Sequence, residues 1–139
     1  MKLIHTLRHP QCLSRAKYKS VLKKDCNIKE KQWPDKFGFE QIRFKRYLPN
    51  NKDEFKEHVD VGDYASARRF LVFFLYLNDN YGGHTSFSEY DTVVQPKTGR
   101  LLMFPPNWCY PHYAEKVTEN PKYILGSYGC LLYTSDAAD

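Results

Sequence analysis

The chain has 139 residues, of which 42% are hydrophobic and 16% aromatic, enough to fill one compact core. Its net charge of +5 is uneven, because residues 1–56 hold 15 of the 21 lysines and arginines but only 6 acidic residues. No apolar run approaches the roughly 18 residues of a membrane span, and no apolar leader opens the chain. These features predict a single cytoplasmic domain and exclude a membrane-spanning protein.

The first part of the chain, residues 1–38, is expected to be a basic helical segment. The stretch LSRAKYKSVLKK, residues 13–24, places apolar residues at roughly helical intervals, and the polar residues 25–38 form a turn-rich connector. A basic block can bind nucleic acid or an acidic protein. Its aromatic residues are not interleaved as a base-stacking platform requires, so we interpret it as a solvated basic face.

Residues 39–129 have the sequence pattern of a β domain. FEQIRFKRYL alternates, and RRFLVFFLYLND is a continuous apolar run that suits a strand buried on both faces. NYGGHTSF, DTVVQPKTGRLLMF, NWCYPHYAEKV and KYILGSYG then follow, each closed by Gly, Pro or Asn turn residues. Many short strands with no helical stretch between them predict an all-β jelly roll, or double-stranded β-helix.

The cysteines and the last ten residues each support a separate prediction. Cys12, Cys26, Cys109 and Cys130 show no C-x-x-C spacing, so we interpret them as free thiols. The final stretch CLLYTSDAAD, residues 130–139, resembles a sequencing adapter read through in frame. We therefore expect residues 130–139 to be a non-native tail.

One candidate metal site begins in the stretch FKEHVDVGDY. His58 and Asp60 stand two residues apart, so in an extended chain their side chains point to the same side and could grip one cation. The alternative is that both side chains face water. His112, after a Pro-rich turn, is a candidate third ligand, and two histidines with one carboxylate form the facial triad of non-haem iron(II) oxygenases.

The order of these motifs carries a family resemblance. HVD, FLVFFLYLND, GGHTSF, PKTGRLLMFPP, a later histidine and a final lysine follow one another over about residues 40–129. In this the chain resembles the prolyl 4-hydroxylase-like iron(II)- and 2-oxoglutarate-dependent dioxygenases, and looks closest to versions from marine bacteriophages. The fold of that family is a double-stranded β-helix.

The resemblance implies a set of site residues. The iron ligands would be His58, Asp60 and His112, and Lys122 would pair with the distal carboxylate of 2-oxoglutarate. Two further cosubstrate contacts would be Tyr47, which matches a family tyrosine upstream of His-x-Asp, and Thr85, which matches a family threonine near the pocket. Packing roles remain the alternatives for these last two residues.

One residue departs from the family pattern. The family usually has glutamate before its threonine, whereas this chain has His84, which could compete for metal or face solvent or substrate.

The implied activity is hydroxylation of a C–H bond with release of succinate and CO₂. The cofactor would be iron(II), with 2-oxoglutarate and O₂ as cosubstrates and ascorbate as a candidate reductant. The partner would be a peptide, with a prolyl residue as the first candidate for hydroxylation, or a small molecule. The protein would act in the cytoplasm, or in the cytoplasm of a host cell if the gene belongs to a phage. The sequence leaves the oligomeric state open.

Two other classes of function stay open. A non-catalytic cupin-like module could bind a metal or ligand in the same fold, but it would have no need of a buried Lys122. Nucleic acid as substrate is disfavoured, because the stretch HYAEKVTENPKYILGSYG lacks the arginines that nucleic-acid demethylases of the superfamily carry after the distal histidine.

Overall fold

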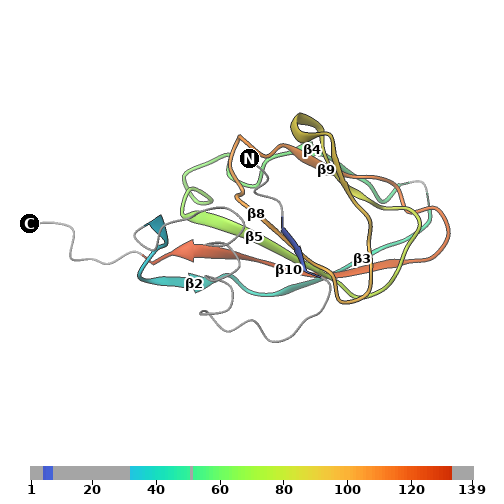
Figure 1. Cartoon of the computed structure of the whole chain (residues 1–139), viewed down its shortest axis with the longest axis horizontal. Coiled ribbons are helices and arrows are strands. Elements are labelled where there is room, and N and C mark those ends of the chain that lie inside the picture. The colour runs from blue at the N-terminus through green and yellow to red at the C-terminus, as the bar shows by residue number, and fades with distance from the viewer. Residues whose placement is uncertain (1–4, 8–31, 51, 133–139) are drawn as a thin grey trace, which may run out of the picture.

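The structure is a computed structural model in which residues 5–7, 32–50 and 52–132 are described. These residues form two antiparallel sheets that lie opposite each other (Figure 1). The strands are β1 (His5–Leu7), β2 (Phe37–Phe39), β3 (Arg43–Tyr47), β4 (Phe55–His58), β5 (Arg69–Tyr76), β6 (Thr85–Phe87), β7 (Thr92–Val94), β8 (Leu101–Phe104), β9 (His112–Ala114) and β10 (Lys122–Leu131), with a 3₁₀ turn η2 (Ser88–Tyr90). This mainly β architecture confirms the predicted jelly roll. None of the described segments is a helix long and apolar enough to cross a bilayer.

The larger sheet is organised around its longest strand, β10. On one side β10 pairs with β5, which is followed by β8 and β1, and on the other side it pairs with both β2 and β3. Side chains alternate across a strand, and in the first half of β10 Lys122 and Ile124 are buried while Tyr123 and Leu125 are only half-buried. The sheet therefore directs Lys122 into the interior.

The smaller sheet has the order β4, β9, β6, β7, so strands distant in sequence lie side by side. β4 pairs with β9 and β6 pairs with both β9 and β7, all antiparallel. This order brings the end of β4 next to the beginning of β9, although more than fifty residues separate them. The pairing of these two strands determines where the candidate ligands lie.

The core fills the space between the two sheets. Val72 and Tyr76 of β5, with Leu102 and Phe104 of β8 and Phe87 of β6, are almost completely buried. Full burial of one such aromatic or aliphatic side chain stabilises the fold by about 1.5–3 kcal/mol. The prediction that β5 is buried on both faces is wrong in part, because its other face is only half-buried.

The expected domain divisions fall inside strands. The division between residues 38 and 39 falls within β2, and the expected tail begins at Cys130, which is buried and pairs with Gly38 where β10 meets β2. The predicted helix at residues 13–24 lies outside the described residues. Cys109 and Cys130 are free thiols, as predicted, whereas Cys12 and Cys26 also lie outside.

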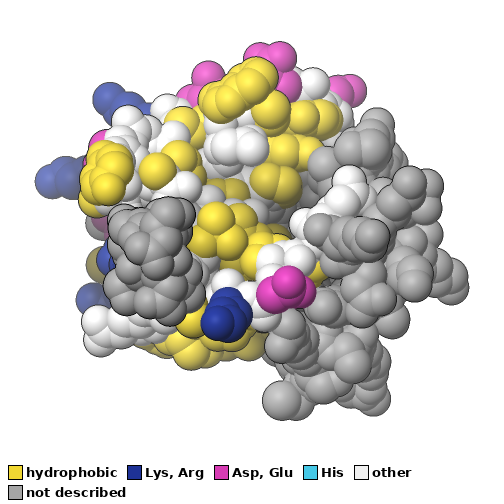
Figure 2. Space-filling view, turned by 90° about the vertical axis from the view of Figure 1, so that its left-hand side faces the viewer, with side chains coloured by type: hydrophobic (Ala, Val, Ile, Leu, Met, Phe, Trp, Pro, Cys, Tyr) yellow, Lys and Arg dark blue, Asp and Glu magenta, His cyan; other side chains and the backbone are white. Residues whose placement is uncertain are grey.

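An aromatic cluster ties residues 33–39 to the larger sheet. Trp33 packs edge-on against Phe37 and Phe70, with ring centroids 5.9 and 5.4 Å apart, and Phe39 packs edge-on against Phe73 at 5.6 Å. Figure 2 views the molecule from this end and shows hydrophobic side chains gathered there. Residues 33–38 are therefore part of the β fold.

Candidate functional site: a His-Asp-His cluster beside a buried lysine

The two histidines meet because β4 pairs with β9. His58 ends β4 and His112 begins β9, and the register places them directly opposite each other. Their rings lie 4.4 Å apart, centroid to centroid. His112 is 3% exposed and packs against Phe104 and Phe87, which fix its ring. The structure thus brings together the histidines that the sequence analysis paired.

Asp60 completes the cluster from the loop after β4. Its backbone N–H donates to the carbonyl of Pro106 at 3.0 Å, and its own carbonyl accepts from Arg69 Nη1 at 3.0 Å. The hydroxyl of Tyr128 donates to Asp60 Oδ1 at 2.7 Å. Because both the backbone and one carboxylate oxygen are held, the second oxygen has a fixed direction.

Both imidazoles are oriented for ligation through the same ring atom. Nδ1 of His58 lies 2.7 Å from the carbonyl of Lys56, and Nδ1 of His112 lies 3.0 Å from the carbonyl of Tyr110. A carbonyl can only accept, so each Nδ1 carries the proton and each Nε2 presents a lone pair. Burial lowers the pKa of His112, which favours the neutral form that a metal requires.

The three ligand atoms converge on one another. Asp60 Oδ1 lies 3.8 Å from Nε2 of His58, Asp60 Oδ2 lies 3.5 Å from Nε2 of His112, and the candidate ligand atoms all lie within 4.8 Å of one another. Atoms that share one ion at about 2.1 Å in neighbouring positions are about 3 Å apart, so small rotations would close the set. Asp60 Oδ2 is buried without a hydrogen-bond partner in the described part of the chain. A cation would satisfy this oxygen, so the residues fit a metal.

Lys122 lies in the same pocket as the cluster, and it is 2% exposed. Its Nζ donates to the carbonyl of Gly83 at 2.7 Å, and among the described residues no carboxylate lies within ion-pair distance of it. Burial lowers the pKa of Lys122 to about 8. A buried ammonium with a neutral partner is costly, so the pocket is suited to an anion.

Gly83 makes the position of Lys122 possible. Its φ of +65° is in the left-handed region, and a Cβ at this residue would lie 3.1 Å from Cδ and 3.2 Å from Nζ of Lys122. Gly83 therefore adopts a backbone conformation that favours glycine and leaves space for the lysine.

The other predicted cosubstrate residues line the same pocket. Tyr47 is the direct cross-strand partner of Lys122, whose Nζ lies 4.5 Å from the Tyr47 ring centroid. The hydroxyl of Thr85 lies 2.7 Å from that of Tyr76. The predicted residues are thus gathered around one pocket.

Sequence reasoning missed several residues that line this pocket, among them Tyr76 and Lys45. Tyr76 is 1% exposed, and burial raises the pKa of its hydroxyl well above the usual range. Lys45 lines the pocket from β3, two residues before Tyr47. The spacing of two along an alternating strand was the signal that could have placed Lys45 on the same face.

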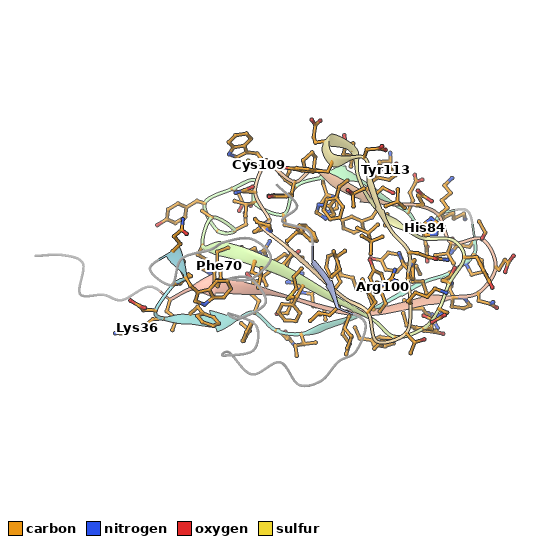
Figure 3. All side chains as sticks on the ribbon, viewed as in Figure 1. Lys36, Phe70, His84, Arg100, Cys109 and Tyr113 are labelled. Atoms are coloured by element: carbon orange, nitrogen blue, oxygen red, sulfur yellow. The ribbon has the colours of Figure 1, made fainter. Side chains whose placement is uncertain are left out.

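His84, which is labelled in Figure 3, comes directly before β6. Its Nδ1 lies 3.1 Å from Oε2 of Glu115, which also accepts from the hydroxyl of Ser86 at 3.1 Å through its other oxygen. His84 is not among the described residues that gather around the candidate metal position. The histidine that replaces the usual glutamate is therefore paired with a glutamate that follows β9.

Comparison with known families agrees with this geometry. A family profile described as 2OG-Fe(II) oxygenase superfamily matches residues 42–128. The chain belongs to this superfamily. No curated protein sequence matches the chain.

Solved structures of similar fold include three prolyl hydroxylases. A viral collagen prolyl hydroxylase from Paramecium Bursaria Chlorella virus-1, in complex with 2-oxoglutarate, is 21% identical, with a TM-score of 0.65 over 94% of this chain and 79% of that one. A Pseudomonas putida prolyl-4-hydroxylase is 17% identical, with a TM-score of 0.61 over 94% and 72% of the two chains. A Trichoplax adhaerens prolyl hydroxylase, in complex with a peptide of hypoxia inducible factor, is 19% identical, with a TM-score of 0.61 over 91% and 61%.

These comparisons confirm the resemblance to the oxygenases and the jelly-roll fold. At such identities the solved structures establish the fold alone. The superfamily implies iron(II), 2-oxoglutarate and O₂, and the His-Asp-His cluster is of a kind that fits iron.

Proposed function

We propose that the protein is an iron(II)- and 2-oxoglutarate-dependent dioxygenase that hydroxylates a C–H bond, with a peptidyl proline as the first candidate substrate. The observation that carries the proposal is the presence of the His-Asp-His cluster and the unpaired buried Lys122 in one pocket. The cluster alone would suit any metal-binding module, and the lysine alone would suit any small anion. Together they match a metal-chelated dicarboxylate.

His58 Nε2, His112 Nε2 and an oxygen of Asp60 would hold the iron. When bound, iron(II) supplies the activation of O₂, so that 2-oxoglutarate, O₂ and R–H become succinate, CO₂ and R–OH. Tyr128 and Arg69 keep Asp60 in place, and the backbone carbonyls of Lys56 and Tyr110 keep each imidazole in the ligating tautomer.

Lys122 would pair with the distal carboxylate of 2-oxoglutarate. Its ammonium is buried and already oriented by Gly83, so little ordering is left for the bound state. The ring of Tyr47 covers the ammonium, and the hydroxyls of Thr85 and Tyr76 offer further donors to the same carboxylate. Ascorbate as reductant is a secondary part of this proposal.

The competing function is a cupin-like module that binds a metal without turnover. Such a module would need the three ligands but not a second cation in the same pocket. The buried Lys122, with only a carbonyl as hydrogen-bond partner in the described residues, therefore favours the oxygenase.

The test is formation of succinate from 2-oxoglutarate with iron(II), O₂ and ascorbate, in the presence and absence of proline-bearing peptides. We expect succinate that depends on iron and is stimulated by a subset of the peptides, with hydroxylated peptide detected by mass. Binding of iron(II) without any succinate, under every substrate condition, would support the metal-binding module instead.

A further inference from the structure

A second lysine, Lys45, lines the pocket and has no part in holding 2-oxoglutarate as proposed above. Because side chains two residues apart on a strand share a face, Lys45 and Tyr47 of β3 both point into the pocket. The Lys45 Nζ lies 5.2 Å from the ring centroid of Phe55, and burial lowers its pKa. No carboxylate of the described residues lies within ion-pair distance of Lys45.

The two lysines differ in burial and in their neighbours. Lys122 is 2% exposed and lies against Gly83. Lys45 lies against Phe55, which is 40% exposed, and Phe55 packs on the ring of His58 at 4.4 Å. Lys45 is therefore less buried than Lys122 and lies beside a residue that packs on a candidate ligand.

The charges in the loaded pocket do not balance without a further anion. Asp60 carries one negative charge, and the two histidines are neutral. Two positive charges of iron(II) and one of Lys122, set against Asp60 and the two carboxylates of 2-oxoglutarate, sum to zero. Lys45 then adds one uncompensated positive charge in a partly desolvated position, where a lone charge is costly.

Asp60 does not compensate Lys45. Its Oδ1 accepts from Tyr128, its Oδ2 lies beside His112, and a bound metal would take up its charge. The attraction between Asp60 and Lys45 is therefore weakened when the site is loaded, and Lys45 becomes available to another anion.

We propose that Lys45 is a specificity residue that binds a carboxylate of the substrate, so that the enzyme prefers a substrate with an acidic group close to the hydroxylated carbon. This inference rests on the proposed oxygenase function and names the substrate class. The carboxylate belongs either to an acidic residue of a peptide or to a free amino acid, and the same ammonium would serve both.

The test uses the full chain loaded with Mn(II) and 2-oxoglutarate without O₂, because Mn(II) accepts the same nitrogen and oxygen ligands. Calorimetry measures binding of matched ligands: proline peptides that differ only by Glu or Gln beside the proline, and L-proline against its amide. We expect the acidic member of one pair to bind about tenfold more tightly, which is about 1.4 kcal/mol.

Three variants separate the possible roles of the lysine. Lys45→Gln should remove the preference, and Lys45→Arg should keep most of it, because the charge remains. Lys36→Gln removes an equal charge from an exposed position far from the pocket, at the other end of the molecule from His84 (Figure 3), and should behave like the wild type. Preference within the peptide pair identifies a peptide substrate, and preference within the proline pair a free amino acid.

Several outcomes would overturn the inference. Equal binding of both members in each pair, or binding of neither, excludes a carboxylate site at Lys45. A Lys45→Gln protein that loses 2-oxoglutarate as severely as Lys122→Gln would place Lys45 on the cosubstrate instead. Failure of the proposed function gives a different result, because the Mn(II)-loaded wild type would then not bind 2-oxoglutarate at all.

Discussion

The two sheets contribute different chemistry to the pocket. The smaller sheet, made of strands three or four residues long, supplies both candidate histidine ligands at the point where β4 meets β9. The larger sheet, whose β5 and β10 have eight and ten residues, supplies Lys122 and Tyr47. A metal-chelated dicarboxylate would join the sheets, with its metal-binding end on one and its distal carboxylate on the other.

Asp60 is where the two sheets depend on each other. It follows β4 of the smaller sheet, yet its carboxylate is held by Tyr128 of β10 and its carbonyl by Arg69 of β5. Arg69 is in turn paired with Glu40 at 2.8 Å and lies 4.0 Å above the Tyr128 ring. The larger sheet thus positions a candidate ligand that it does not carry, and variants can separate these contributions.

The largest effect is expected for Asp60→Ala. Removing one of three ligands, the only anionic one in the cluster, should weaken Mn(II) binding by at least about a hundredfold and reduce succinate formation below detection. Titration with Mn(II) and the succinate assay measure the two effects. Wild-type-like succinate release from this variant would contradict the ligand assignment.

The matching variant on the larger sheet is Lys122→Gln. It should weaken 2-oxoglutarate binding by about a hundredfold, because a carboxylate would be left unpaired at a buried position. Binding of Mn(II) alone should stay within about threefold of the wild type, since Lys122 contacts no metal ligand. Equal loss of metal and cosubstrate binding would mean that the sheets do not act separately. Lys36→Gln serves as the control for loss of one charge.

Tyr128→Phe tests the dependence between the sheets. It removes the hydroxyl that donates to Asp60 Oδ1 and leaves the ring on Arg69 in place. Partners that orient a metal ligand are typically worth about 10- to 100-fold in metal affinity, and we expect the lower end of this range. Unchanged Mn(II) affinity would show that the loop after β4 holds Asp60 without help from β10.

The pH dependence of 2-oxoglutarate binding should report on Lys122. Its pKa is lowered by burial to about 8, and the carboxylate binds the protonated form. Below pH 8 the lysine is already charged, so the affinity is level there. Above pH 8 binding must also protonate the amine, so Kd should rise about tenfold per pH unit. Calorimetry at saturating Mn(II) between pH 7 and 9.5 measures the curve, and a flat curve would contradict Lys122 as the anchor.

The smallest effect is expected for His84→Ala. His84 pairs with Glu115 and lies outside the metal cluster, so Mn(II) affinity should change less than about twofold. A loss comparable to that of Asp60→Ala would show that His84 ligates the metal.

The sequence predicted those parts of the site that depend on local spacing. The spacing of two paired His58 with Asp60, although Asp60 lies in the loop after β4, and short alternating runs indicated a jelly roll. His112 was only a candidate before the resemblance to a family, and Lys122 was assigned through that resemblance alone, since no local pattern says which distant strand lies beside β4 or β3. The structure supplies the pairings of β4 with β9 and β3 with β10.

Other contacts could not be read from the sequence, because they depend on pairing across the larger sheet. Tyr128 reaches Asp60 over 68 positions of the chain, and Cys130 lies beside Glu40 over 90 positions. The strand β2, which spans the division expected after residue 38, could not be read from the sequence, because a three-residue strand is stabilised by its partner β10 and not by its own pattern.

The most direct test of the account is a crystal structure of the protein with Mn(II) and 2-oxoglutarate. We expect one ion about 2.1 Å from Nε2 of His58, Nε2 of His112 and an oxygen of Asp60, with the distal carboxylate about 2.8 Å from Nζ of Lys122. Two results would contradict the claim that the two sheets hold opposite ends of one dicarboxylate. One is an ion bound elsewhere, and the other is a bound 2-oxoglutarate whose distal carboxylate makes no contact with Nζ of Lys122.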